Sequence, residues 1–409
     1  MHVSRKTAIS TASIAAIVIA VLVVIVAGAY IATQPSSTVT VTKSTTATST
    51  SGYTTISTTT YSSASPTYTP ASLQAGGSTF VNPVMQVWVS GFAYQTGGAV
   101  KIDYSALGST AGQKGILKKT YAFGASDAPI SSLLYTQNYT AAYGPLLTIP
   151  EALGGVAIFY NIPKLTVSLN LTGPIIADIY LRNITSWNDS AILAINPGVN
   201  KTLLNIPIIP VHRSDGSGTT YALTTFLERT STDWNASGLG RGTLVNWPST
   251  GELGASGSGG VAGDVASNAG AIGYADSYYA LSNKLLAADI ENSAGKFVAP
   301  TLSTITEAAT ADSALVQADP TYSITDAPTP SNSTVESYPI STYTYILVWA
   351  DQTNQGQGYD IAQFLMWVVT YGQADSPPLN YAALPANIVA IDQGLIGQLN
   401  YNGVPFISG

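Results

Sequence analysis

The sequence contains no cysteine and only two histidines, His2 and His212. The absence of cysteine excludes disulfides, thiolate nucleophiles, cysteine-based metal sites and a lipid-modified cysteine as membrane anchor. Two histidines leave little material for a Ser–His–Asp triad or a histidine-rich metal centre. We therefore expect no metal ion, no cofactor and no enzymatic activity.

Charge is also scarce, because Asp, Glu, Lys and Arg make up only 9% of the chain where about a quarter is usual. The 15 basic residues are outnumbered by 22 acidic ones, which gives a net charge of −7. No basic excess is available to neutralise a phosphate backbone, so nucleic acid is excluded as a partner. With 45% hydrophobic residues over 409 positions, the chain is long enough for two packed lobes.

The N-terminus carries Arg5 and Lys6, followed by an apolar run from Ile9 to Ala32. This run is long enough to span a bilayer as a helix. The basic flank places the N-terminal end in the cytoplasm and the rest of the chain outside. A cleaved signal peptide is the alternative, since Ala27-Gly28-Ala29 offers small residues. We favour an uncleaved single-pass anchor over residues 1–33, with a C-terminal head outside the cell membrane.

Residues 34–71 consist mainly of Ser and Thr and show no helical or strand periodicity. This composition is typical of an extended, O-glycosylated stalk, and an unmodified flexible linker is the alternative. The head that follows contains acceptor sites for N-glycosylation, which agrees with an exported glycoprotein. These sites are Asn138, Asn170, Asn183, Asn188, Asn200, Asn235 and Asn332.

The head alternates short apolar runs with helical patterns, which predicts open α/β lobes. The expected strands are Val100–Tyr104, Val156–Tyr160, Ile206–Val211 and Tyr343–Trp349. The expected helices are Pro83–Tyr94, Ala111–Lys119, Thr219–Glu228, Asp360–Tyr371 and Pro385–Leu399.

Four segments of the head share one pattern, in which a strand ends, a Gly/Ser/Thr turn follows and a helix begins. The amides at a helix N-terminus are unpaired and carry partial positive charge. Small residues let those donors approach a ligand closely, and several converging termini would enclose a small anion. Any one such turn is more often an ordinary helix cap. The segments are Gly76–Phe80, Leu107–Gly112, Phe123–Pro129 and His212–Thr220.

The fourth segment adds a charged pair, Arg213 and Asp215. A guanidinium offers several donors in a planar fork, which suits a tetrahedral oxyanion. Asp215 is placed to hold that guanidinium and to cap the helix that follows. A plain turn salt bridge is the alternative interpretation.

Asp127 in the third segment indicates which anion is bound. A carboxylate repels an anion unless the ligand brings a proton to donate. Phosphate keeps a proton near neutral pH whereas sulfate does not, so this residue favours phosphate. Asp127 could instead simply cap a helix after Pro129.

In their order, these segments resemble those of the phosphate-binding proteins of the phosphate-specific ABC transporter, a family of type II periplasmic binding proteins. The resemblance covers roughly residues 74–400. It extends through Ile149-Pro150 with Gly154-Gly155, Ile184–Asp189, Asn196–Gly198, Gly270–Tyr274 and Tyr338–Ile340.

The resemblance implies two lobes that close by a hinge, one formed by 72–151 and 340–409 and the other by 152–339. It implies delivery of inorganic phosphate to the permease subunits of an ABC importer, with Asp127 accepting the proton of the ligand and Asp215 orienting the arginine. The membrane anchor and stalk resemble those of archaeal surface receptors. The implied phosphate contacts are Thr79, Phe80, Ser109, Asp127, Arg213, Asp215, Ser217, Gly218 and Thr219.

Three other functions stay open. A receptor of this fold could bind sulfate, molybdate or tungstate, although Asp127 argues against it. A secreted phosphatase would need metal ligands or a histidine base, which the chain lacks. A structural protein of the cell surface would agree with the stalk and the glycosylation sites.

Overall fold

The chain divides into two units, Met1–Thr67 and Tyr68–Gly409. The computed structural model describes only the second, over residues 68, 70–130, 144–248, 250–318, 323–325 and 334–407. The anchor expected at 1–33 and nearly all of the stalk expected at 34–71 lie outside these residues. Within them, no helix has the length and apolar character that crossing a membrane requires.

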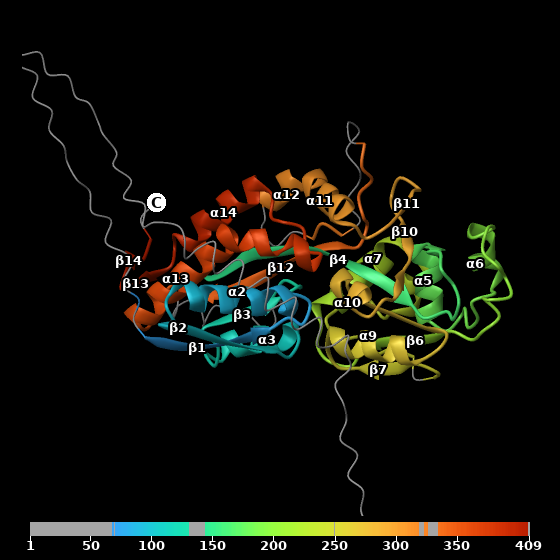
Figure 1. Ribbon diagram of the computed structural model, residues 1–409, viewed down its shortest axis with the longest axis horizontal. Helices are drawn as coiled ribbons and strands as arrows, with labels where there is room; N and C mark the ends of the chain where they lie inside the picture. Colours follow the sequence, from blue (N-terminus) through green and yellow to red (C-terminus); the bar gives the residue numbers. More distant parts are fainter. Residues whose placement is uncertain are drawn as a thin grey trace, which may run out of the picture. The chain divides into compact units, whose positions relative to one another are not determined.

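One curled sheet organises the described residues, and it contains nine strands there (Figure 1). Its strands run in the order β2-β1-β3-β12-β4-β8-β6-β7, and β9 pairs with β4 at one side. In that order they are β2 (Val100–Ala106), β1 (Ala71–Gly77), β3 (Phe123–Ser126), β12 (Ser341–Trp349), β4 (Leu146–Tyr160), β8 (Ala271–Asp276), β6 (Ile209–Arg213), β7 (Leu253–Ala255) and β9 (Leu286–Ala287).

Strand β4 belongs to both halves of this sheet, as Figure 1 shows. Its residues 146–155 pair antiparallel with β12, whereas its residues 156–160 pair antiparallel with β8. We call β1, β2, β3 and β12 with their helices the first lobe, and β6, β7, β8 and β9 with theirs the second lobe. The boundaries expected from the sequence fall within β4 and just before β12, and they stay predictions.

Helices pack on the sheet of each lobe, and additional short strands lie outside it. The helices α2 (Asn82–Gln95), α3 (Ser109–Leu117) and α13 (Gln355–Val369) pack on first-lobe strands, and α14 (Ala386–Ile396) packs on β4 and α13. The 3₁₀ turns η1 (Tyr371–Asp375) and η2 (Pro377–Leu379) follow α13. The other helices are α5 (Gly173–Tyr180), α6 (Ser190–Ile195), α7 (Gly218–Thr230), α8 (Thr232–Ser237), α9 (Gly257–Ser267), α10 (Ser277–Ser282), α11 (Leu302–Ala311) and α12 (Ser313–Ala318). The short strands are β5 (Asn170–Leu171), β10 (Asp289–Glu291), β11 (Phe297–Val298), β13 (Asn400–Tyr401) and β14 (Val404–Pro405).

Helix α2 illustrates how the sequence builds this core. Pro83 stands in its first turn, where a missing N–H costs nothing. Trp88 and Phe92 follow at helical spacing and are buried. Phe92 packs edge-on against Phe364 of α13, and the Trp88 indole donates to the Gly372 carbonyl at 2.7 Å. Each such aromatic ring contributes roughly 1.5–3 kcal/mol through burial.

All five expected helices are present with shifted ends, and the expected strand Ile206–Val211 is wrong over its first three residues. Strand β6 begins only at Ile209. The Ile208 amide donates instead to the Thr185 carbonyl at 2.9 Å, and the Trp187 amide donates to the Ile206 carbonyl at 3.1 Å. These bonds to the segment 185–187 replace the hydrogen bonds that residues 206–208 would make within the sheet. Apolar residues suit either environment, so the sequence pattern does not distinguish them.

The helix expected at Asp360–Tyr371 is also shifted. It is α13, which begins at Gln355 because the Asn354 side chain accepts from the Gln357 amide and caps it. It ends at Val369, and Tyr371 belongs to η1.

Candidate functional site

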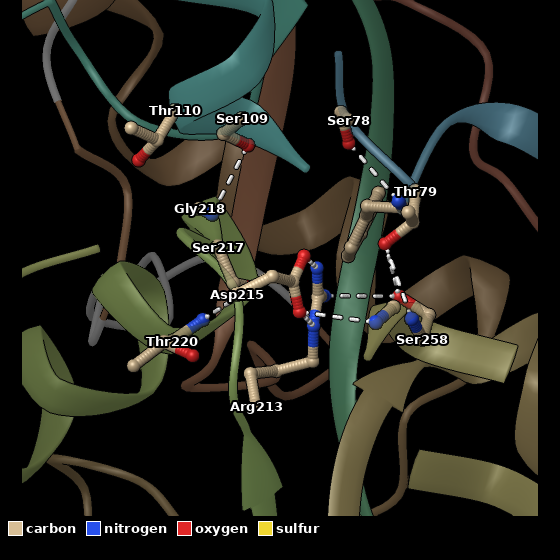
Figure 2. Close-up of polar contacts among 12 residues, drawn as sticks. Ser78, Thr79, Ser109, Thr110, Arg213, Asp215, Ser217, Gly218, Thr220 and Ser258 are labelled. Carbon is tan, nitrogen blue, oxygen red and sulfur yellow. Dashed lines mark hydrogen bonds and ion pairs between the residues drawn. The ribbon is translucent and has the colours of Figure 1, made fainter. Parts of the chain in front are cut away.

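Loops that follow strands of both lobes meet at one place between α2, α3, α7 and α9 (Figure 2). Three of the four segments expected from the sequence do connect a strand to a helix, namely β1 to α2, β2 to α3 and β6 to α7. The third segment begins as β3 itself and continues to Pro129, but the helix expected after Pro129 falls among residues 131–143, outside those described. The carboxyl ends of strands in open α/β sheets are where such proteins bind ligands.

The Arg213–Asp215 pair that the sequence predicts is present at the end of β6. Arg213 Nε donates to Asp215 Oδ1 at 2.7 Å, and Nη2 donates to Oδ2 at 2.5 Å. This is a bidentate ion pair, and Figure 2 shows the two groups facing each other. Burial raises the pKa of Asp215, but the hydrogen bonds and charge of Arg213 outweigh it and hold the pKa below its ordinary value.

The expectation that Asp215 caps the following helix is wrong. The cap of α7 is Ser217, whose hydroxyl accepts from the Thr220 amide at 3.2 Å. Asp215 Oδ1 instead accepts from the Gly257 amide at 3.0 Å, at the start of α9. A Ser one residue before the helix reaches the third amide better than an Asp three residues before it.

Asp127 lies after β3 and is 3% exposed. Its Oδ1 accepts from the Ser78 hydroxyl, and its Oδ2 accepts from the Ser109 hydroxyl at 3.2 Å. Burial raises the pKa of Asp127, while the hydroxyl of Ser78, the hydroxyl of Thr344 and the charge of Arg213 oppose that rise. The arginine and this carboxylate, which come from different lobes, therefore act on each other electrostatically.

Thr79 and Ser109 reach across from the first lobe to the second. The Thr79 hydroxyl lies 3.0 Å from the Ser258 hydroxyl and accepts from the Ser258 amide at 3.1 Å. The Ser109 hydroxyl accepts from the Gly218 amide at 3.0 Å, in the first turn of α7. The Phe80 amide is one of the ligand contacts that the family resemblance implies. Here it donates to the Ser78 hydroxyl of its own loop at 3.0 Å.

Thr219 follows in the same first turn of α7, and it is fully buried. Its hydroxyl has no hydrogen-bond partner among the residues that the structure describes. A buried polar group without a partner is unfavourable by roughly 1–3 kcal/mol, so such groups in native proteins call for an explanation. A ligand oxygen at the N-terminus of α7 would satisfy it.

Gly108 permits the close approach of the two lobes. Its φ of +94° is one that favours glycine, and a Cβ there would lie 2.5 Å from Asp215 Oδ2 and 2.7 Å from the Gly216 carbonyl oxygen. The neighbouring Thr110 hydroxyl donates to the Thr243 hydroxyl at 3.1 Å. The loop of β2 thus contacts the second lobe through backbone as well as side chains.

Three residues that organise the site were not assigned from the sequence. Ser258 accepts from Arg213 Nη1 at 3.4 Å, and it lies in the first turn of α9, at the end of the run Gly254-Ala-Ser-Gly-Ser258. That run has the strand-to-helix pattern of the other loops and could have been found. Ser78 stands within the first expected loop. Tyr274 ends the segment Gly270–Tyr274, which was given no role at the site from the sequence, yet its hydroxyl accepts from the Arg213 amide at 3.1 Å.

His212 lies beside the site without joining these contacts. Its ring stacks on Trp247 with centroids 5.3 Å apart, and its Nε2 is 3.7 Å from Glu252 Oε1. Among the described residues, no group of His, Asp and Glu could hold a metal ion. The chemistry brought together here is therefore one cation, one buried carboxylate, several hydroxyls and helix N-termini.

Comparison with known proteins places this arrangement in a family. The model of a PBP superfamily domain matches residues 43–370. The chain is 36% identical over 321 residues to the phosphate-binding protein PstS of Xylella fastidiosa, covering 78% of this chain and 82% of that protein. It is 34% identical over 346 residues to the PstS of Methanocaldococcus jannaschii, covering 80% and 86%.

Solved structures share the fold at lower identity. The chain is 18% identical to a phosphate-binding protein from Stenotrophomonas maltophilia, with a TM-score of 0.61 over 79% of this chain and 93% of that one. It is 20% identical to a high affinity periplasmic phosphate-binding protein solved with phosphate, with a TM-score of 0.61 over 82% and 99%. These likenesses support the two-lobed α/β architecture.

Proposed function

Because the chain belongs to the family of the phosphate-binding proteins PstS, we propose that it captures inorganic phosphate and delivers it to an ABC importer. It is an extracytoplasmic receptor and not an enzyme, as membership of a family of binding proteins implies. Phosphate binds between the two lobes, and ATP is hydrolysed by separate subunits of the importer. The chain has no Gly-x-x-x-x-Gly-Lys-Ser/Thr loop for that purpose.

The observation that carries this proposal is the pairing of opposite charges across the site. Arg213 supplies a cation held in a fixed orientation, while Asp127 supplies a buried carboxylate from the other lobe. A fully deprotonated anion is attracted by Arg213 but is repelled by Asp127. Phosphate satisfies both groups, because one of its oxygens carries a proton that Asp127 can accept.

The remaining contacts follow from the loops. Arg213 is the cation, Asp215 orients it, and Asp127 reads the proton of the ligand. The burial of Thr219 with an unpartnered hydroxyl supports its place at the ligand. The other proposed contacts are Thr79, Phe80, Ser109, Ser217, Gly218 and Thr219, through hydroxyls and backbone amides at the starts of α2, α3 and α7.

Capture requires that the lobes move apart and close again. The contacts of Thr79 with Ser258 and of Ser109 with Gly218 join the lobes. Strand β4 runs through both lobes, and the chain re-enters the first lobe where β12 begins, so β4 and the start of β12 are the proposed hinge. A micromolar site needs about −8 kcal/mol, more than the ~1.5–3 kcal/mol of any one charge-assisted bond, so donors from both lobes must act together.

We further propose that residues 1–33 anchor the receptor in the cell membrane and that residues 34–71 form a stalk. The apolar run after Arg5 and Lys6 supports the anchor, and the Ser/Thr composition supports the stalk. Glycosylation of the head at the Asn-X-Ser/Thr sites belongs to the same proposal. Mass spectrometry of the protein from membranes tests all three, and an N-terminus beginning near Tyr30 would exclude the anchor.

Calorimetry of the purified chain with phosphate and with sulfate tests the ligand. We expect phosphate to bind and to raise the melting temperature, and sulfate to do neither at equal concentration. Equal binding of sulfate, molybdate or tungstate would make the chain a general oxyanion receptor. No effect of any of them would favour a structural role at the cell surface.

A further inference from the structure

A second buried carboxyl group lies behind Asp127. Glu151 on β4 is 0% exposed, and its Oε1 is 3.2 Å from the Thr344 hydroxyl oxygen on β12. Its Oε2 has no hydrogen-bond partner among the described residues. The backbone of Glu151 is fixed as well, because the Gln373 side chain donates to its carbonyl at 2.9 Å. An ionised carboxylate in such a place would be left without adequate solvation.

A β-bulge directs this side chain. In the pairing of β4 with β12, Thr344 is opposite Ala152 and Tyr345 is opposite Pro150, so Glu151 is the extra residue. Bulges re-aim side chains and are frequent beside functional sites. Here the irregularity brings Glu151, on the strand β4 that continues from the first lobe into the second, to Thr344 of β12.

Thr344 is shared between Glu151 and Asp127. Its hydroxyl also acts as a hydrogen-bond partner of Asp127 and opposes the rise of the pKa of that carboxyl, while Asp127 in addition accepts from Ser78 and Ser109. A hydroxyl has only one proton to donate. If both carboxyls were ionised, Thr344 could satisfy only one of them, and the other would remain a buried charge with an unmet acceptor.

The surroundings decide which carboxyl keeps the proton. Burial raises the pKa of Asp127, but its hydroxyl donors and the charge of Arg213 oppose that rise and favour its ionised form. Burial raises the pKa of Glu151 well above its ordinary value, and the charge of Asp127 adds to that rise against the opposing bond from Thr344. Burial raises the pKa of Tyr104 on β2, and the charges of Glu151 and Asp127 add to that rise.

We propose that Glu151 is a positioning residue for the anion site, a neutral acid that donates its proton to Thr344 and thereby keeps Thr344 donating to Asp127. Because the Thr344 proton then points toward Asp127, Asp127 cannot donate a hydrogen bond to Thr344. Asp127 stays ionised and ready to accept a hydrogen bond from the ligand. This inference rests on the proposed function of the site in binding phosphate. Glu151 contacts no ligand itself, and it acts on selectivity through two successive hydrogen bonds.

The protonation of Glu151 is tested directly by infrared spectroscopy of the full chain in D₂O at neutral pH. The infrared spectrum of the wild type minus that of Glu151→Gln should contain the carbonyl stretch of one protonated carboxylic acid. A difference that instead shows only the bands of an ionised carboxylate would overturn the inference. This measurement needs no phosphate, so it decides the inference even if the wild type binds none.

The effect on selectivity is tested with a matched pair of variants. Glu151→Gln keeps an N–H that can donate to Thr344, whereas Glu151→Met has similar volume and no donor. We expect Glu151→Met to lower the preference for phosphate over sulfate about fivefold under mildly acidic conditions, the loss of one hydrogen bond. Glu151→Gln should keep the wild-type preference.

Two results would overturn the selectivity role: wild-type preference in Glu151→Met, or an equal loss in Glu151→Gln. Circular dichroism establishes that both variants are folded before binding is measured. If Glu151→Met does not fold, the comparison of Glu151→Gln with wild type across pH still applies, because equal profiles are required of a neutral donor. A wild type that fails to bind phosphate would contradict the proposed function and leave the infrared result standing.

Discussion

The two lobes bring opposite chemistry to the site. The second lobe supplies Arg213, whose charge is balanced by Asp215 within the same loop. The first lobe supplies Asp127, a buried carboxylate that is balanced by the hydroxyls of Ser78 and Ser109. Each lobe therefore holds its own charged group in place with its own neighbours. Neither half of the site needs the other lobe in order to be ordered, which is what a receptor that opens and closes requires.

Under the proposed function, this difference would separate affinity from selectivity. A guanidinium attracts any tetrahedral oxyanion, so the second lobe would provide most of the electrostatic binding energy. The carboxylate opposes every anion that lacks a proton, so the first lobe would choose among them. Closure joins the two contributions, and the contacts that permit it come from both lobes.

The largest expected effect comes from removing the cation. Arg213→Ala should weaken phosphate binding by about 3–5 kcal/mol, because it deletes several charge-assisted bonds and leaves Asp215 unpaired. Calorimetry measures it. Arg241→Ala is the control. Its Nε lies 3.5 Å from Glu228 Oε2 in a half-exposed ion pair, and such pairs contribute little to stability. Equal losses in the two variants would contradict the assignment.

A smaller effect is expected from neutralising the carboxylate of the first lobe. Asp127→Asn should narrow the preference for phosphate over sulfate by roughly a hundredfold, because an amide can donate to an unprotonated oxygen. Competition calorimetry gives the ratio directly. Asp103→Asn, at an exposed position of β2, is the control, and an unchanged ratio in Asp127→Asn would break the division between the lobes.

Closure itself is tested at Gly108. Gly108→Ala should lower phosphate affinity by about 1–2 kcal/mol, because the added methyl would overlap Asp215 and the Gly216 carbonyl. Gly98→Ala is a close control, since Gly98 also has positive φ but nothing lies within 4 Å of its Cβ. Both should lose similar stability in denaturation, and only Gly108→Ala should lose affinity. Equal affinity in the two would show that the lobes need not approach so closely.

The smallest expected effect concerns pH. Burial raises the pKa values of Asp392, Asp276 and Glu151 well above their ordinary values. Such groups stabilise the fold fully below their unfolded pKa, and this stability is lost as pH rises toward the folded pKa. Asp215, with a lowered pKa, acts in the opposite sense and loses its contribution as pH falls.

The carboxyls with a raised pKa outnumber Asp215, so the free energy of unfolding should be greater near about pH 5 than near about pH 8. Urea denaturation at both pH values measures this difference. Asp392→Asn should reduce the difference by about 1 kcal/mol, whereas Asp103→Asn should leave it unchanged. A greater stability at the higher pH would mean that these carboxyls are ionised in the folded chain.

Much of the site was predictable because its parts are local. Arg213 and Asp215 are two residues apart at the end of one strand, so the backbone of a single turn brings their side chains together. The helix starts after Gly76, Leu107 and His212 follow from Gly/Ser/Thr turns between apolar runs. These signals depend only on neighbouring residues, as do caps and turns generally.

What the amino-acid sequence determined by itself was the family, the α/β alternation, the loops and the identities of the charged groups. Tertiary structure alone decided which hydroxyls surround Asp127. It also brought Thr79 to Ser258, 179 residues away along the chain, and Glu151 to Thr344, 193 residues away. The reason is physical. Contacts of that range are set by strand order, by one bulge in β4 and by the closeness of the two lobes, and none of these leaves a periodic signal in the chain.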